Sequence, residues 1–556
     1  MAIAGLTIVA LAVRFENIGR AGLSPDEPLT WLAIAGIDAH GLPLLPSGVL
    51  YERGLLYSFA AWLAGEAAGH RIEVYRAVSA ASGAFLPALV YLVLRPAGMM
   101  PALAVALPLA VHPTLVVTSA WARFYGPATI AAVVALYAMR TAADGSSRRW
   151  AMASIAAATL LHEYAAVLAL FPLALWASAT DPHFRRQCRR LLVMTVLVFA
   201  LTMAAVLVVK RMLPGLSGSA AEHGLTVQLA HAFRSTPPPL AATAGAIAAI
   251  VSLACIAVPP KARRFLLAGA AAVAALVLTH TASLLLFTDT PFSWRLPLQM
   301  LRVSMVYPWA AWWFLPRVDP AILLLIAATA ISAILIRPTD RNVFGRAVLL
   351  LLLATLFLYG VIEMGFVERY LSLLYAPAAI AAIAIWDVSW SRASRAAAGL
   401  AAFLLAWSAA TTIGRPVFIG GSDTPKTSWD VVRTRLPGKT LICSDDLACS
   451  YFLRIPDVWL AAAGSDRDSF AVPTGGGLVS AYTGADVTHT IDQIDRIAAT
   501  SSGGVLIVVA AGRFDFPAAE ALVRLALRRH QGTALVDGPR FLAIEVFPLD
   551  PPEGRR

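Results

Sequence analysis

Charged side chains are scarce in this chain. Of its 556 residues, 14% are Asp, Glu, Lys or Arg and 59% are hydrophobic, and the mean hydropathy is +0.71. A soluble protein of this size would need a far more polar surface, so a soluble globular fold is excluded. Apolar runs long enough to cross a hydrocarbon core of about 30 Å recur along the first three quarters of the chain. The composition therefore predicts a polytopic α-helical membrane protein.

Cysteine is also rare, with four residues in the chain. Four scattered cysteines are too few for a disulfide framework, and although Cys443 and Cys449 lie close together, we expect them to remain unpaired. The first 19 residues carry no basic leader and no clean small-residue cleavage site before Arg14. They are interpreted as a retained first span rather than as a signal peptide.

The basic excess, a net charge of +11 with a pI near 9.8, does not indicate nucleic acid. The basic residues lie in short loops between apolar runs, which is the distribution that the positive-inside rule produces. We assign these loops to the cytoplasmic side: Arg95, 140–149, 185–190, 261–264, 337–346 and 391–395. An even number of crossings must then separate neighbouring loops.

This rule predicts about thirteen transmembrane helices, with the N-terminus inside and the C-terminus outside. The predicted spans are 1–19, 73–94, 98–118, 126–141, two short helices in 150–178, 191–212, 237–258, 265–287, 319–336, 347–362, 371–388 and 396–413. The segment 53–69 is expected to lie at the outer interface, because counting it as a crossing would break the parity. The aromatic loop 288–318 is typical of an interface belt.

The composition changes near residue 420, which divides a membrane module (1–419, with a first outer loop at 14–72) from a small extracytoplasmic α/β domain (420–556). Predicted strands and helices alternate there, as in α/β folds. The strands are 438–444, 504–510 and 540–547, and the helices are 445–454, 487–500 and 517–530. The glycine-rich stretch 474–480 lacks a phosphate-binding pattern and is predicted to be a loop.

Motifs of soluble enzymes and of metal sites are missing. The sequence shows no His/Cys/Asp cluster with zinc spacing, no G-x-S-x-G and no Cys/His arrangement. We therefore predict no metal ligands and no certain cofactor, although the sequence leaves a divalent metal open.

The turns assigned to the outer side collect polar residues: Asp26, Glu27, Arg53, Arg123, Tyr125, His162, Tyr164, Arg369 and Tyr370. Ionisable groups at this depth are costly unless they are paired or functional. Carboxylates in one turn and arginines in three suit a substrate with a lipid tail and a phosphate, since arginine forks bind phosphate oxygens.

Simpler interpretations stay open for several of these residues. The stretch "SPDE" is also a capping box, with Ser24 at the N-cap, Pro25 at N1 and Glu27 at N3, and Asp26 is equally suited to capping and to chemistry. Arg123 and Arg369 are also typical of arginines that extend along the membrane interface.

The order of these motifs resembles the GT-C superfamily of integral-membrane glycosyltransferases, nearest the bacterial relatives of protein O-mannosyltransferases and the aminoarabinose transferase that modifies lipid A. The similar stretches are the Asp-Glu pair, "EVYRAVSAASGAFLPALVYLVLR" (73–95), "LAVHPTLVVTSAWARFYGP" (109–127), "TLLHEYAAVLAL" (159–170) and "VERYLSLLYAP" (367–377). The resemblance implies a GT-C fold of about thirteen helices.

It also implies transfer of a sugar from a polyprenyl-phosphate donor to an envelope glycan, lipid or protein acceptor, with inversion at the anomeric carbon. The implied location is the outer face of a bacterial plasma membrane, among its lipids. The family's acidic residue maps onto Asp26, beside Glu27, as the general base, and its basic residue onto Arg53. The other family turns map onto Arg123 and Tyr125, His162 and Tyr164, and Arg369 and Tyr370, as ligands of the donor.

Two alternatives remain: a transporter or flippase of lipid-linked glycans, and a scaffold whose α/β domain binds a partner. The enzymatic hypothesis requires Asp26 and the arginines to share one cavity.

Overall fold

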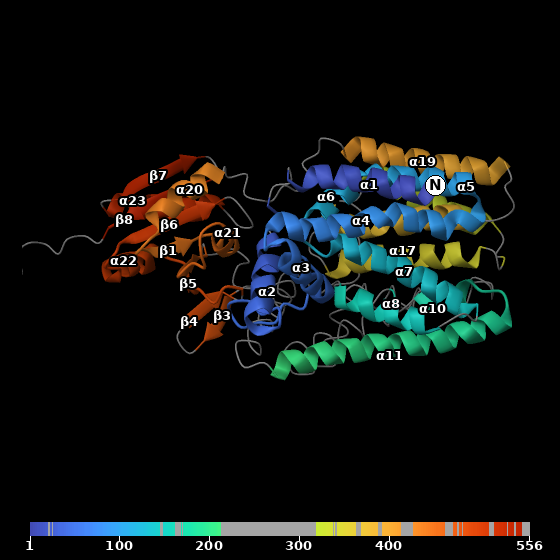
Figure 1. Cartoon of the computed structure of the whole chain (residues 1–556), viewed down its shortest axis with the longest axis horizontal. Helices are drawn as coiled ribbons and strands as arrows, with labels where there is room; N and C mark the ends of the chain where they lie inside the picture. Colours follow the sequence, from blue (N-terminus) through green and yellow to red (C-terminus); the bar gives the residue numbers. More distant parts are fainter. Residues whose placement is uncertain are drawn as a thin grey trace, which may run out of the picture.

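A computed structural model describes residues 1–19, 23–24, 26–144, 148–161, 168, 171–212, 319–336, 339, 342–362, 368–386, 392–412, 426–461, 471–474, 477–480, 482–510, 516–530, 532–538 and 541–547. An elongated helical bundle occupies one end of the molecule and an α/β domain the other (Figure 1). The N-terminus lies toward the end of the bundle that is remote from the α/β domain.

The bundle is built from long apolar helices. In chain order its main helices are α1 (Ala2–Ile18), α4 (Ile72–Leu94), α5 (Met99–Val111), α6 (Pro113–Ala120), α7 (Tyr125–Ala143), α8 (Arg148–Leu161), α10 (Phe171–Ser178), α11 (Pro182–Met212), α16 (Pro320–Leu335), α17 (Val343–Ile362), α18 (Glu368–Ala384) and α19 (Arg392–Thr412). A 3-10 turn, η1 (Arg95–Ala97), follows α4. Small residues let these helices approach closely: the Cβ of an alanine at Gly126 in α7 would lie 2.6 Å from the Ser79 carbonyl oxygen of α4.

The predicted apolar runs in the described ranges are confirmed as helices, but the number thirteen is not. Within the described ranges, three helical segments are long and apolar enough to cross a membrane: Ile72–Ala97, Tyr125–Ala143 and Pro182–Val206. A fourth is added if Met99–Val111 and Pro113–Ala120 form one bent span. The predicted spans 237–258 and 265–287, and the loop 288–318, lie outside the described residues.

The predicted single span 98–118 is instead two helices, α5 and α6, bent by 52°. The break falls at His112, which is extended (φ −61°, ψ 121°) and precedes Pro113. A residue before proline is pushed away from helical geometry, and proline cannot continue the preceding hydrogen-bond ladder. The bend brings the end of α6 to the turn at residues 121–124.

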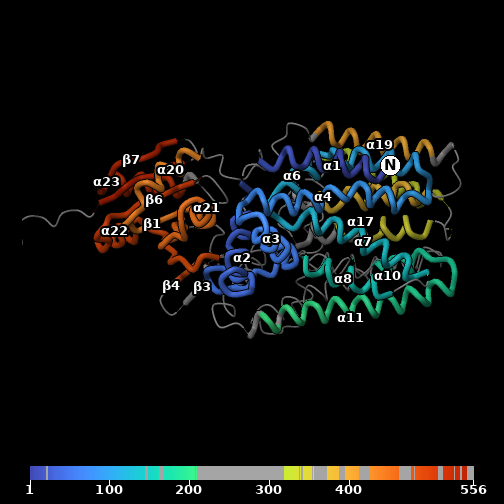
Figure 2. The backbone as a smooth tube through the Cα atoms, viewed as in Figure 1, coloured from blue at the N-terminus to red at the C-terminus, as the bar shows by residue number. Residues whose placement is uncertain are grey.

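Two helices, α2 (Glu27–His40) and α3 (Leu55–Ala68), lie between the bundle and the α/β domain (Figure 2). In Figure 1, α2 runs across the direction of the long bundle helices. The prediction of a helix within 53–69 is confirmed by α3, while its position at a membrane interface stays a prediction. Gly41 ends α2 in a left-handed conformation (φ +72°), which a glycine adopts at no steric cost.

The α/β domain holds an eight-stranded sheet in the order β3-β4-β5-β2-β1-β6-β8-β7. Strands β5, β2, β1 and β6 are mutually parallel, and the outer strands at both edges are antiparallel. The strands are β1 (Thr440–Cys443), β2 (Val458–Leu460), β3 (Ala471–Thr474), β4 (Gly477–Ser480), β5 (Asp486–Thr488), β6 (Val505–Ala510), β7 (Thr533–Gly538) and β8 (Phe541–Val546). Strands β6 and β8 are buried throughout, as expected of apolar strands covered on both faces.

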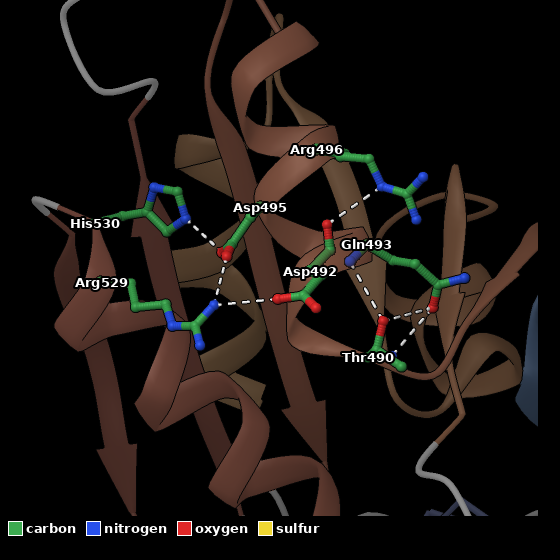
Figure 3. Close-up of polar contacts among 7 residues, drawn as sticks. All are labelled: Thr490, Asp492, Gln493, Asp495, Arg496, Arg529 and His530. Atoms are coloured by element: carbon green, nitrogen blue, oxygen red, sulfur yellow. Dashed lines mark hydrogen bonds and ion pairs between the residues drawn. The ribbon is translucent and has the colours of Figure 1, made fainter. Parts of the chain in front are cut away.

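Among the described residues of this domain, four helices accompany the sheet: α20 (Lys426–Arg435), α21 (Asp446–Phe452), α22 (Ile491–Thr500) and α23 (Phe516–Arg529). Helix α22 opens with a capping box between Thr490 and Gln493 (Figure 3). The Arg529 guanidinium, 2.7 Å from Asp495, and the His530 ring, 2.8 Å from the same carboxylate, tie α23 to α22. Hydrogen bonds from these two partners outweigh burial and hold the pKa of Asp495 below its usual value.

The predicted strands and helices of this domain are confirmed with two corrections. The stretch 474–480, predicted to be a loop, contains strand β4, whose Leu478 and Val479 pair with β3 despite the neighbouring glycines. The helix predicted to begin at 487 begins at Ile491, because Val487 and Thr488 pair with β2 as strand β5. The predicted domain boundary at 420 lies outside the described residues.

The expectation of unpaired cysteines is wrong for Cys443 and Cys449, which form a disulfide. Cys443 ends β1, and Cys449 lies in α21, six residues later. Their pairing follows from the tight turn that leads from the strand into the helix, so their Cα atoms come within 6.5 Å. Cys188 is a free, buried cysteine.

Candidate functional site

At one end of the bundle, three segments meet around the predicted acidic pair. They are the start of α2, the turn at residues 121–124 and the first turns of α4. Glu27 is fully buried, and Asp26 is 5% exposed. The structure places α2 two residues later than the sequence predicted. Asp26, rather than Ser24, is its N-cap residue, and Glu27 is its first residue. One half of the predicted capping box is retained, because the Ser24 N–H donates to the Glu27 carboxylate at 2.6 Å.

Glu27 joins segments that are far apart in the chain. Its carboxylate accepts two hydrogen bonds from the Arg76 fork, both at 2.8 Å, and one from the Ala122 N–H at 2.6 Å. Arg76 also donates to the carbonyl of Ile18 at 2.9 Å. The bidentate pair satisfies two charges that would otherwise be costly to bury. Glu27 thereby fixes the direction of α2 relative to α1, α4 and the 121–124 turn.

Asp26 lies against Arg123, the arginine of that turn. Arg123 is 3% exposed, and its Nη1 donates to the backbone carbonyl of Asp26 at 3.1 Å, to Thr30 Oγ1 at 3.3 Å and to the Tyr51 hydroxyl. Its guanidinium carbon is 4.8 Å from the centre of the Phe124 ring, a cation–π contact. The residue predicted as the base and one residue predicted to bind phosphate are therefore neighbours.

One N–H donor of Arg123 has no hydrogen-bond partner among the described residues. This donor is the buried Nε. An unsatisfied buried donor usually costs about 1–3 kcal/mol, and more on a charged group. Such a donor in a native structure calls for an explanation, of which a ligand is one.

The Tyr51 hydroxyl lies among the charged groups of Asp26, Arg53 and Arg123. Burial raises its pKa to about 12, with Asp26 adding to the rise and the positive charges of Arg123 and Arg53 opposing it. The phenol therefore stays protonated at neutral pH, and its oxygen accepts a hydrogen bond from Arg123. Arg53 itself is exposed, two residues along the same loop. The structure thus brings Asp26, Arg53 and Arg123 to one place.

Tyr125, the first residue of α7, completes the described part of the predicted site. It is 2% exposed, and its ring centre is 5.9 Å from the Arg123 guanidinium carbon. Arg369 and Tyr370 lie in the first turn of α18, whose side chains there are outside what the structure describes. His162 and Tyr164 also lie outside the described residues.

The α/β domain covers this region. Leu447 of α21 is 1% exposed and packs with a set of apolar residues from α2 and the following loop: Leu29, Leu32, Ala33, Leu45 and Tyr51. Trp31 meets Tyr451 edge to face, with ring centres 5.5 Å apart. The N–H of Ser47 donates to the carbonyl of Tyr482 at 3.4 Å. The loop that carries Tyr51 and Arg53 is therefore held between the bundle and the α/β domain.

Sequence reasoning missed Arg76, Tyr51 and Thr30 as parts of this site. A signal for Arg76 was present, because it is an arginine within a predicted span, where an ionisable side chain needs a partner. Tyr51 and Thr30 carried no comparable signal, since their roles depend on contacts with the distant Arg123.

Metal ligands were not predicted, yet within the described residues one group of side chains converges as a metal site requires. Asp38, Glu66 and His70 place one ligand atom each within 4.8 Å of one another. This group belongs to the C-terminal ends of α2 and α3, and not to the Asp26 site at the beginning of α2.

Comparison with known proteins gives neither a matching family model nor a curated relative. Among solved structures, the oligosaccharyltransferase of Archaeoglobus fulgidus in its apo form superposes with a TM-score of 0.53 at 13% identity, covering 93% of this chain and 72% of its own. ArnT from Cupriavidus metallidurans, bound to undecaprenyl phosphate and apo, matches at TM-score 0.45 and 14% identity over 98% of this chain and 97% of ArnT.

The likeness to the archaeal oligosaccharyltransferase shows the class of fold: the chain shares the fold of that protein over 93% of its length.

Proposed function

We propose that this protein is an inverting glycosyltransferase that transfers a sugar from a polyprenyl-phosphate carrier to an acceptor hydroxyl. The observation that carries the proposal is the unpartnered Nε of buried Arg123 beside Asp26, because a cation with a free donor next to a carboxylate suits a phosphate leaving group next to a base. The general reaction is supported by the fold, which the chain shares with an archaeal oligosaccharyltransferase.

In the proposed mechanism Asp26 accepts the proton of the acceptor hydroxyl as its oxygen attacks the anomeric carbon. The bond between that carbon and the phosphate oxygen breaks, and the electron pair leaves with the polyprenyl phosphate. Arg123 and Arg53 stabilise the developing charge, and the Tyr51 hydroxyl donates a further hydrogen bond. General-base assistance is typically worth about 10²–10⁴-fold, and stabilisation of the leaving group contributes in addition.

The remaining predicted residues keep supporting roles. Glu27, whose carboxylate already accepts four hydrogen bonds, acts as a positioning residue for Asp26 rather than as a second base. Tyr125 supports Arg123. His162, Tyr164, Arg369 and Tyr370 remain predicted ligands of the donor's sugar and phosphate.

We infer a location in a bacterial plasma membrane, with the α/β domain on the extracytoplasmic side. The Cys443–Cys449 disulfide supports this side, because disulfides persist in oxidising compartments and are rare in the cytosol. The acceptor would then be an envelope glycan, lipid or protein.

The test begins with mass spectrometry of envelope glycans from cells with and without the gene, which identifies the modification and the acceptor. Asp26→Asn is then compared with wild type in proteoliposomes supplied with the polyprenyl-phosphate sugar. We expect product formation to fall at least about 100-fold at an unchanged unfolding temperature. The matched control, Glu73→Gln, changes an exposed carboxylate on α4 and should retain full activity.

Full activity of Asp26→Asn would rule out the base assignment. Movement of the lipid-linked sugar across the bilayer without any product would favour the transporter alternative instead.

A further inference from the structure

A second polar group lies at the opposite end of α2 from Asp26. Asp38 belongs to the last turn of α2, Glu66 to the last turn of α3, and His70 follows α3 directly. Their ligand atoms lie within 4.8 Å of one another, and the His70 Nε2 is 2.8 Å from a Glu66 oxygen. All three are exposed, so a charged ligand could reach them without a large desolvation cost.

Neighbouring residues fix the position of the His70 ring. Gly69, with φ +90°, turns the chain back after α3, and Gly65 leaves room for the ring. A Cβ at residue 65 would lie 2.5 Å from the His70 Nδ1. The same Nδ1 is 2.8 Å from the Tyr75 hydroxyl. Metal-binding histidines almost always have the second ring nitrogen hydrogen-bonded in this manner, which fixes the tautomer and the ring direction.

The local field also favours a cation. The C-terminal ends of α2 and α3 meet here, and each contributes the partial negative charge of a helix C-terminus. Two carboxylates add to it. A nearby basic residue is Arg71, and its guanidinium is 3.5 Å from the Ala68 carbonyl oxygen, at the helix end.

We propose that Asp38, Glu66 and His70 bind a divalent first-row cation of the zinc or manganese type, which joins the C-terminal ends of α2 and α3. Two carboxylates and one imidazole are a ligand set that both ions accept, with water in the remaining positions. Zinc–ligand distances of about 2.0–2.2 Å require the three side chains to move by about 1 Å or less from their present separations.

Such a cation would act on the loop between the two helices. This loop, residues 41–54, carries Tyr51 and Arg53. The cation would join the end of α2 at which the loop begins to the far end of α3, and so hold the two helices that flank the loop in a fixed relative position. The expected effect on sugar transfer rests on the proposed function, whereas cation binding does not.

The test uses the full-length protein without a polyhistidine tag, freed of metal by chelation and titrated with Co²⁺ and Zn²⁺. We expect one saturable equivalent of Co²⁺ with a visible absorption band, displaced by Zn²⁺. His70→Gln and Asp38→Asn should each weaken binding at least 10-fold, and Glu73→Gln, which alters a nearby exposed carboxylate outside the group, should not. Absence of saturable binding, or equal affinity in wild type and His70→Gln, would overturn the proposal.

Gly65→Ala keeps all three ligands and replaces a helical glycine with a better helix former. The added methyl group displaces the His70 ring, so we expect binding at least 10-fold weaker at an unchanged or higher unfolding temperature. Unaltered affinity in this variant would contradict the proposed geometry. If Co²⁺ binds as expected but Asp26→Asn retains transfer, the cation site stands and the proposed catalytic mechanism fails.

Discussion

At the scale of single residues, Glu27 and Arg76 form a buried ion pair. Both side chains are almost fully removed from solvent and bind each other through two parallel hydrogen bonds. Breaking a buried pair by removing one partner leaves an uncompensated charge, which is far more costly than losing a surface ion pair.

Glu27→Gln should therefore lower the free energy of unfolding by about 3–5 kcal/mol. The measurement is denaturant or thermal unfolding in detergent, with Glu73→Gln as the exposed control. Combining Glu27→Gln with Arg76→Met should be less damaging than the sum of the single changes, because the second removes the charge that the first leaves unpaired. Strict additivity would contradict this pairing.

Arg123 permits a finer test of the same region. Arg123→Lys keeps the positive charge but removes the guanidinium fork and its free Nε. Lysine cannot reproduce bidentate binding of phosphate, so we expect the transfer efficiency kcat/KM to fall about 10–100-fold, a loss of about 1.4–2.8 kcal/mol of transition-state stabilisation. Steady-state kinetics with the polyprenyl-phosphate sugar provide the measurement, and unaltered kinetics would exclude Arg123 from the phosphate site.

At the scale of elements, α2 connects the Asp26 site, the α/β domain and the group around Asp38. Its first residue pairs with Arg76, one face packs on α21 and its last turn carries Asp38. Helix α21 contributes Leu447 to this contact, at 1% exposure. The packing explains how the α/β domain covers the Asp26 site.

Leu447→Ala should weaken this packing by about 2–5 kcal/mol, the usual cost of truncating a buried leucine. We expect faster amide hydrogen exchange in α21 and in residues 29–33, measured by mass spectrometry. Val431→Ala, an exposed position of α20, is the matched control. Equal exchange in both variants would show that α21 does not hold the domain on α2.

At the scale of the whole molecule, two predictions can be tested. One concerns the stability that the Cys443–Cys449 disulfide contributes, and the other concerns the membrane topology. Replacing Cys443 and Cys449 with serine removes the constraint on a short loop, which in the chain-entropy treatment costs about 2 kcal/mol of stability. The α/β domain should unfold at a lower temperature, and reduction of the wild-type protein should reproduce the shift. An unchanged transition after confirmed reduction would contradict a stabilising role.

The topology prediction concerns the two ends of the chain. Because basic loops favour the cytoplasm, an alkaline phosphatase fused to the C-terminus should be exported and active, while one fused to the N-terminus should be inactive. The reverse pattern would invert the proposed orientation and place the α/β domain on the cytoplasmic side.

The sequence by itself determined the class of the protein and most of its described elements. Apolar runs predicted α4, α7, α16 and α17, because hydrophobicity and helical period are properties of contiguous residues. In the α/β domain the same local reasoning found β1, β6 and β8. It also predicted that Asp26 and Arg123 lie in turns on one side, since basic loops favour the cytoplasm.

Only the tertiary structure decided which of these turns meet. The Glu27–Arg76 pair spans 49 residues, the Arg123–Tyr51 contact spans 72, and Asp38 joins Glu66 and His70 across two helices. Local patterns carry no information on such pairings, because they depend on how helices pack and bend. The sequence thus predicted which residues lie in turns on one side of the bundle, and packing decided which of them meet.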